Sequence, residues 1–116
     1  MALAETLSIY QPARDLLLLV MKLQQNFPRS YRPTMARDVS TEAQAVVIGV
    51  FRANSATDKR PHLETLRERL ETLKLLLRLS KDLHLISPSQ FGATVELTTA
   101  IGRQLTGWMN YYKDRA

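Results

Sequence analysis

Two histidines, His62 and His84, are the residues of this 116-residue chain best suited to acid–base or metal chemistry. Neither has a second ligand at a useful spacing, and neither belongs to an HExxH or ExxH pattern. The chain has no cysteine, which excludes a disulfide, a zinc–thiolate site and a cysteine nucleophile. Walker A, GxGxxG and GxSxG motifs are also missing. The sequence therefore predicts a protein that is not an enzyme and uses neither a metal nor another cofactor.

Structural roles are expected for the two residues that most resemble catalytic ones. His84 continues the heptad row of Leu63, Leu70 and Leu77, and we expect it to cap the end of a helical bundle. Glu42 lies near the apolar face of its predicted helix. We expect it to pair with an arginine across a helix or subunit boundary rather than to act as a general base.

The charge balance points to a polyanionic partner. Sixteen Lys and Arg against eleven Asp and Glu give a formal net charge of +5, and arginine predominates among the cations. The planar guanidinium suits phosphate better than the lysine ammonium does. Nucleic acid is therefore favoured over an acidic small molecule.

The first basic cluster surrounds a predicted loop. Between Lys22 and Asp38 the chain contains no acidic residue, and the cations there are Lys22, Arg29, Arg32 and Arg37. Tyr31 lies among them, and an exposed aromatic beside positive charge suits phosphate contact together with base stacking. No base-reading helix or groove-inserting arm is present, so we expect binding without sequence specificity.

The second basic cluster recurs along a predicted helix. Its members share one stripe and are Arg60, Arg67, Lys74, Arg78 and Lys81. Glu64, Glu71 and Asp82 are interleaved at spacings of three and four residues, so part of this stripe is expected to form ordinary surface ion pairs.

Apolar residues at helical spacing predict four helices over about 8–26, 33–53, 59–83 and 88–112. Prolines and the NSATDK segment at 54–59 separate the first three, and SPSQ at 87–90 is a capping-box pattern that starts the fourth. Short connections favour antiparallel neighbours, so the chain is expected to be a single all-α domain over 1–116, an up-down-up-down four-helix bundle. The expected core anchors are Leu70, Leu73, Leu77, Ile101, Leu105 and Trp108.

A second leucine row on the third helix consists of Leu76, Leu79 and Leu83, and is expected to widen the apolar seam of that helix. The apolar run at 16–21 is far too short to cross a bilayer, and no signal-peptide pattern precedes it. We therefore expect a soluble, unprocessed, cytoplasmic protein.

The last helix contains IGRQLTGWMNYY at 101–112, with two glycines that each cost about 1 kcal/mol relative to alanine. Ile101, Leu105, Trp108 and Tyr112 form one stripe. Gly102 and Gly107 lie about 140° apart around the helix, so we expect at least one of them to mark a second surface where another backbone comes near. Met109 and Tyr111 are expected to add apolar area to the same flank. A homo-oligomer is therefore predicted, with an interface at Gly102, Gly107, Met109 and Tyr111.

The order of these signals resembles the four-helix-bundle family that includes the accessory variability determinant (Avd) of diversity-generating retroelements. The similarity covers about residues 8–113 and is most specific at KLLLRLSKDLHLIS (74–87) and IGRQLTGW (101–108). Bundle proteins encoded in intervening sequences of bacterial ribosomal RNA genes are related. Those proteins usually carry an IPSNIAEG-like stretch where this chain has VVIGVFRANS at 46–55, so the sequence is more similar to the Avd branch.

The resemblance implies a homopentamer of four-helix bundles. It also implies a non-enzymatic accessory protein that binds the retroelement reverse transcriptase and nucleic acid, either RNA or an RNA–DNA hybrid, during mutagenic copying of a template RNA. The basic surface would then contact nucleic acid, and the second apolar flank would be the pentamer seam. The alternative is a stand-alone oligomeric bundle that binds another protein, with its charge serving only solubility.

Overall fold

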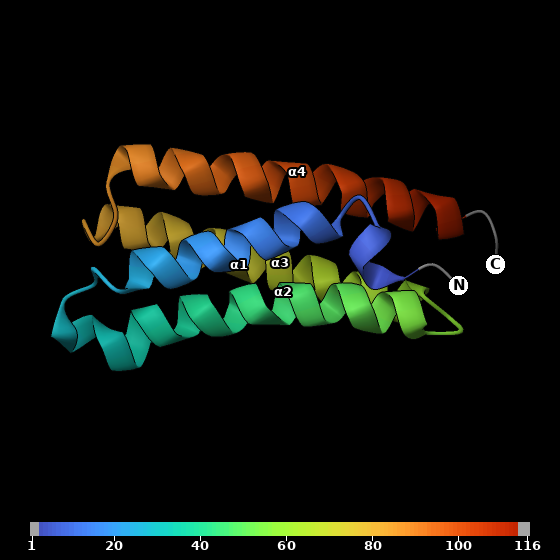
Figure 1. Cartoon of the computed structure of the whole chain (residues 1–116), viewed down its shortest axis with the longest axis horizontal. Helices are drawn as coiled ribbons and strands as arrows, with labels where there is room; N and C mark the ends of the chain where they lie inside the picture. The colour runs from blue at the N-terminus through green and yellow to red at the C-terminus, as the bar shows by residue number, and fades with distance from the viewer. Residues whose placement is uncertain (1–2, 114–116) are drawn as a thin grey trace.

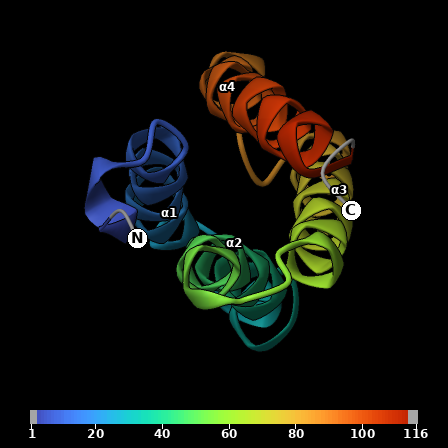
Figure 2. The ribbon, with the colours of Figure 1, turned by 90° about the vertical axis from the view of Figure 1, so that its right-hand side faces the viewer.

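A computed structural model describes residues 3–113 of the chain, and every regular element in that range is helical. Four long helices form the molecule: α1 (Tyr10–Gln24), α2 (Arg37–Ser55), α3 (Arg60–Asp82) and α4 (Pro88–Lys113). They lie along the long axis of a body that measures 46 × 22 × 21 Å (Figure 1). Viewed from the end, α1, α2, α3 and α4 follow one another around the bundle axis (Figure 2). The all-α prediction is confirmed, and the four helices form a bundle.

The predicted helix bounds differ from the observed ones mainly at the first loop. A short 3-10 helix, η1 (Ala4–Thr6), precedes α1, and a second, η2 (Arg29–Tyr31), follows it. The second helix was predicted to begin at Pro33, but the segment η3 (Arg32–Ala36) is π-helical and α2 begins at Arg37. Proline has no N–H to donate, so a position in the first turn of η3 costs no helical hydrogen bond.

One apolar core runs between the four long helices. Its most completely buried members include Val50 of α2, Leu66 and Leu73 of α3, and Ile101 of α4. Of the predicted core anchors, Leu70, Leu73, Leu77, Ile101 and Leu105 are buried, and Trp108 is half-buried against the same cluster. Burying a leucine side chain contributes about 1.5–3 kcal/mol, so this continuous cluster holds the bundle together.

Of the four glycines, Gly49 has the closest neighbour, at a position where no close approach was predicted. A β-carbon at this position would lie 2.9 Å from Cδ1 of the buried Leu66, so α2 and α3 pack closely only because the side chain is absent. At Gly102 a β-carbon would lie 4.0 Å from Leu70, and at Gly107 nothing lies within 4 Å. Within the described chain, Gly102 and Gly107 therefore allow no close approach of another helix.

The row of Leu76, Leu79 and Leu83 was expected to widen the apolar seam of α3. Only Leu76 contributes to that seam. Leu76 is half-buried against the core, whereas Leu79 and Leu83 are exposed. The two side chains point away from the four-helix core, because α3 already presents Leu66, Leu70, Leu73 and Leu77 to it.

The C-terminus of α3 is closed by a histidine in an unusual conformation. His84 is exposed and has φ 60°, in the left-handed region that favours glycine. The N–H of Leu85 donates to the Ser80 carbonyl at 2.8 Å, and the N–H of His84 donates to the Lys81 carbonyl at 2.9 Å, which is a Schellman motif. His84 therefore ends α3 at one end of the bundle, but it is exposed and does not extend the buried row of Leu63, Leu70 and Leu77.

Candidate nucleic-acid interface

The basic cluster of the first loop lies at the end of the bundle where α1 passes into η2, η3 and α2 (Figure 1). Lys22, Arg29 and Arg37 are exposed. None of the three forms an ion pair within 4.0 Å in the part of the chain that the structure describes. These three cations keep their charge available for a ligand, since no carboxylate neutralises them.

Arg32 belongs to the same cluster but has a structural role. Its Nε donates to the Phe27 carbonyl at 3.4 Å and its Nη2 donates to the Gln25 carbonyl at 3.3 Å. The C-terminal carbonyls of a helix have no partner in the helix and carry partial negative charge, which a guanidinium satisfies. Arg32 therefore stabilises the exit from α1 and is only partly available to a phosphate.

Tyr31 does not form the exposed stacking platform that was predicted. Its side chain is half-buried against a second apolar cluster formed by Leu23, Phe27, Ala36 and Ile86. This cluster closes the loop end of the bundle and fixes the positions of the flanking arginines. The cluster of basic residues is therefore suited to phosphate contact, with base stacking on Tyr31 restricted by burial.

A groove between α1 and α2 lies beside this cluster and has a volume of about 410 Å³. Its lining contains no carboxylate and consists of Gln24, Gln25, Arg32, Ala36, Arg37, Ser40, Thr41 and Gln44. Amides, hydroxyls and guanidinium groups are the side chains that most often contact phosphate and sugar. The amides and hydroxyls of this groove were not predicted from the sequence. The helical spacing of Arg37, Thr41 and Gln44 places them on one side of α2, and this spacing could have revealed them.

The stripe on α3 is largely neutralised by neighbouring groups. Arg60 pairs with Asp58 at 3.2 Å, Arg67 with Glu64 at 3.1 Å and Lys74 with Glu71 at 3.4 Å. Lys81 lies 4.8 Å from the centre of the Phe91 ring, in a cation–π contact. The expected surface pairing with the interleaved acids is confirmed for Glu64 and Glu71, whereas Arg60 pairs with Asp58, which precedes α3, and Asp82 forms no ion pair within residues 3–113.

Asp58 shows the local effect of one such pair. The Arg60 side chain donates a hydrogen bond to Asp58, and so does the Arg60 backbone N–H. These two hydrogen bonds hold the pKa of the exposed Asp58 carboxyl below its usual value. Arg60 is therefore engaged at the first turn of α3 and is less available to a ligand.

Two further grooves lie between α3 and α4. One, of about 390 Å³, brings Arg60 and Arg67 together with Lys113, a cation that sequence analysis did not single out. The other, of about 430 Å³, contains Lys74 and Arg78. Each groove also contains a glutamate, Glu64 in the first and Glu71 in the second, so neither matches the carboxylate-free groove between α1 and α2.

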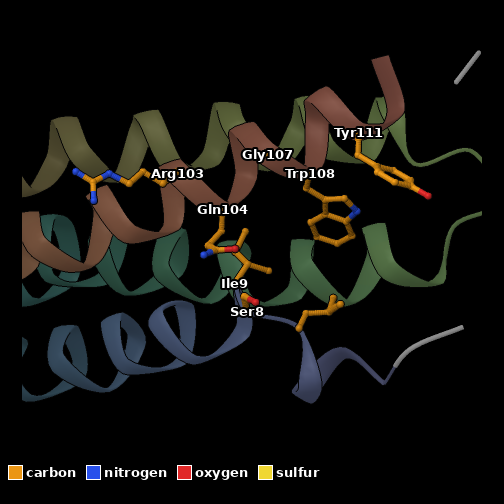
Figure 3. A pocket seen from close by; sticks show the side chains of 8 residues that line it. Ser8, Ile9, Arg103, Gln104, Gly107, Trp108 and Tyr111 are labelled. Atoms are coloured by element: carbon orange, nitrogen blue, oxygen red, sulfur yellow. The ribbon is translucent and has the colours of Figure 1, made fainter. Parts of the chain in front are cut away.

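The predicted interface residues of α4 do not lie on one flank. Gly107 and Tyr111 line a groove of about 380 Å³ between α4 and the start of α1, where Trp108 points toward the N-terminal segment (Figure 3). Met109 lies in the groove toward α3 instead. The expectation that Met109 and Tyr111 share a flank is wrong, because two residues along a helix rotate by about 200°.

The prediction for Glu42 is confirmed. Its Oε1 accepts a hydrogen bond from Arg69 Nη1 at 3.0 Å, which joins α2 to α3. Oε2 of the same carboxylate is buried without a hydrogen-bond partner. Glu42 therefore serves as an interhelical contact.

No group of three or more metal-binding side chains occurs within residues 3–113. In the same range no helix is long and apolar enough to cross a membrane.

A family model described as bAvd-like matches residues 7–112 of the sequence. The matched range includes all four long helices except the last residue of α4, as well as the basic first loop. The search of curated proteins found no match.

Proposed function

This chain belongs to the bAvd-like family, and from that premise we propose a non-enzymatic, nucleic-acid-binding accessory protein. In this proposal it partners a retroelement reverse transcriptase and its template RNA, and possible ligands include an RNA–DNA hybrid formed during mutagenic copying. The observation that carries the proposal is the family match over almost the whole chain. The unpaired cations of the first loop support it, because they offer phosphate contacts that need no rearrangement of ion pairs.

The proposal takes the molecule to be one domain with antiparallel, up-down-up-down helices. The colour gradient in Figure 1 supports this, because it reverses from each long helix to the next. It also takes the chain to self-associate, with a homopentamer expected from the family resemblance. Several copies in one particle would present several first loops to one RNA, and linked sites raise the effective affinity.

The principal experiment measures RNA retention against salt concentration for the full chain. Each phosphate contact contributes about −0.7 to −0.9 to the slope of log affinity against log salt. Reversing Lys22, Arg29 and Arg37 to glutamate should therefore flatten the slope by about 2 to 3 per chain. Arg32 is left intact because its reversal would disrupt the end of α1.

A matched control reverses Arg60, Arg67 and Lys74, three cations that already pair with acids. The same change in net charge should reduce retention less than the loop variant does. Equal losses would show that only net charge matters, and a flat salt response of the wild-type protein would remove the nucleic-acid proposal. Unchanged retention by both variants would place the RNA contact on another surface, and no retention by the wild-type protein at low salt would favour the stand-alone scaffold that binds another protein.

A further inference from the structure

The groove between α4 and the start of α1 contains open space at a glycine. Gly107 lines this groove of about 380 Å³, and a β-carbon at Gly107 would meet nothing within 4 Å. Glycine inside a helix lowers stability relative to alanine, and no neighbour in residues 3–113 requires the missing side chain here. What Gly107 provides is therefore room in the groove, which we call the α4 groove.

Two planar side chains lie on either side of this open space along α4. Arg103 precedes Gly107 by four residues and Tyr111 follows it by four, so the three lie on one side of the helix and all line the groove. Two helical turns separate the Cα atoms of Arg103 and Tyr111 by about 12 Å. A flat ring in van der Waals contact with a planar group on each face needs about 7–8 Å between those groups. The row therefore has room for one flat ring at Gly107.

The two planar groups differ in freedom of movement. The ring of Tyr111 makes an edge-to-face contact with Tyr112, with ring centres 4.8 Å apart, and Tyr112 packs against the core. Arg103 is exposed, forms no ion pair within residues 3–113, and points away from Tyr111 (Figure 3). Exposed side chains change rotamer within picoseconds to nanoseconds, so the guanidinium of Arg103 can turn onto a ring that enters the groove.

The deeper wall of the groove combines an aromatic ring with polar groups. Gln104 and Trp108 are one turn apart on α4, and Figure 3 shows both directed toward the segment that contains Ser8 and Ile9. The Gln104 amide both donates and accepts hydrogen bonds, and so does the Ser8 hydroxyl. Groups of this kind bind the polar edge of an unstacked nucleobase. The groove therefore offers planar contacts for the faces of a base and hydrogen bonds for its edge.

The charge of the groove fits one nucleotide of a polynucleotide. The lining contains no carboxylate, and Arg103 is its cation. A single guanidinium suits the one phosphate that accompanies each base of an RNA strand. The several charges of a free nucleoside di- or triphosphate would need further cations, which the lining does not supply.

We propose that the α4 groove binds one unpaired base of single-stranded RNA, stacked between the guanidinium of Arg103 and the ring of Tyr111, beside Trp108. Aromatic rings and arginine planes are the surfaces on which proteins stack the bases of single strands. This inference rests on the RNA binding in the proposed function and adds a base-binding site at the end of the bundle opposite the basic first loop (Figure 1). It supplies the stacking that Tyr31, half-buried in that loop, does not.

The fluorescence of Trp108 gives a direct readout, because it is the only tryptophan of the chain. A short oligoadenylate added to the full-length protein at low salt should quench this fluorescence. An abasic oligomer of the same length carries the same phosphates without bases and should not. Adenosine monophosphate should bind at least about tenfold more weakly than the oligoadenylate, because it lacks the phosphate contacts that an oligomer makes outside the groove.

Variants of the groove locate the bound base. Gly107→Leu fills the open space and should abolish quenching at unchanged helicity. Gly92→Leu is a matched control, since Gly92 is an exposed glycine of the same helix with nothing within 4 Å of a β-carbon, and it should keep the wild-type response. Tyr111→Ala should weaken oligoadenylate binding at least about fivefold, whereas Tyr111→Phe keeps the ring and should bind as the wild type does.

Equal quenching by the abasic oligomer, quenching that survives Gly107→Leu, or equally tight binding of adenosine monophosphate would overturn this inference. A lower solution mass of Gly107→Leu would also overturn it, because another copy of the chain would then cover the groove. RNA that is retained without quenching of Trp108 would overturn the inference and leave the proposed function intact. Absence of any RNA retention at low salt is the distinct result that would remove the proposed function, and this inference with it.

Discussion

His84 shows how a single residue at the end of a helix can lower stability. A residue with a β-carbon in the left-handed region costs roughly 1–2 kcal/mol, and glycine avoids this cost. We expect His84→Gly to raise the free energy of unfolding by about 0.5–1 kcal/mol, measured by urea denaturation. His62→Gly is a chemically matched control inside α3 and should lower it by a few tenths of a kcal/mol. A loss of stability in His84→Gly would contradict this account of the helix end.

The Glu42–Arg69 pair gives a second prediction at the scale of residues. The Glu42 side chain is only 14% exposed and one of its oxygens already lacks a partner, so removing Arg69 leaves a poorly solvated carboxylate. Arg69→Met should destabilise the protein by about 1–3 kcal/mol. The double variant Glu42→Met, Arg69→Met should recover most of that loss, as measured by a double-mutant cycle. Equal stabilities of the single and double variants would show that the pair does not couple α2 to α3.

Residue roles could be predicted where one element alone determines them. An acid on the apolar side of a helix needs a cationic partner, which is why the pairing of Glu42 could be expected. The role of Lys59 could not be predicted in this way. Its Nζ donates to the carbonyls of Ala53, Asn54 and Ala56 at 2.9–3.2 Å and so closes the C-terminus of α2. Arg32 does the same for α1. Both contacts depend on how the chain turns after a helix, which spacing alone does not determine.

At the scale of elements, the start of α4 gives a direct test of helix capping. The Ser87 N–H donates to Gln90 Oε1 at 2.8 Å, and the Gln90 N–H donates to Ser87 Oγ at 3.0 Å, so the predicted capping box is confirmed. Ser87→Ala should cost about 1 kcal/mol in the free energy of unfolding. Ser89→Ala, two residues away and exposed, should change stability by less than about 0.5 kcal/mol. Similar losses in the two variants would show that the capping box contributes nothing specific.

The packing of α2 on α3 gives the second prediction at this scale. Gly49→Ala places a β-carbon 2.9 Å from Leu66, which is fully buried and has little room to move. Overpacking of this kind costs about 1–3 kcal/mol, which offsets or exceeds the gain of about 1 kcal/mol in helix propensity. Gly92→Ala, with open space around it, should instead stabilise the protein by about 0.5–1 kcal/mol. The midpoint temperature of thermal unfolding should therefore rise in Gly92→Ala, and in Gly49→Ala it should fall or stay close to the wild-type value.

Helix positions followed from the sequence because apolar periodicity, prolines and the capping box each mark an element locally. The close packing of α2 and α3 at Gly49 did not follow from the sequence. A glycine in a helix has the same local sequence pattern whether or not a neighbouring helix approaches it. The site shows the same division. The unpaired cations near the first loop could be predicted from the absence of nearby acids. The burial of Tyr31 could not be predicted, because it depends on Ile86, which lies more than fifty residues later in the chain.

At the scale of the whole molecule, one substitution tests whether the groove of α4 lies between copies of the chain. Gly107→Leu adds a large side chain where the protomer leaves open space, so folding should be unaffected. If copies associate through a surface other than the α4 groove, the solution mass should stay unchanged. A lower mass would show that the α4 groove lies in the interface, as the glycine pattern suggested. Light scattering distinguishes an unchanged solution mass from a lower one, and far-UV circular dichroism checks that the variant is folded.

Figure 1 places the start of η1 and the end of α4 together at one end of the bundle, with the basic first loop at the other. An anchor joined to either terminus would therefore hold the molecule by the same end. Immobilisation through an N-terminal or a C-terminal tag should give equal RNA capture, since both leave Lys22, Arg29 and Arg37 directed into solution.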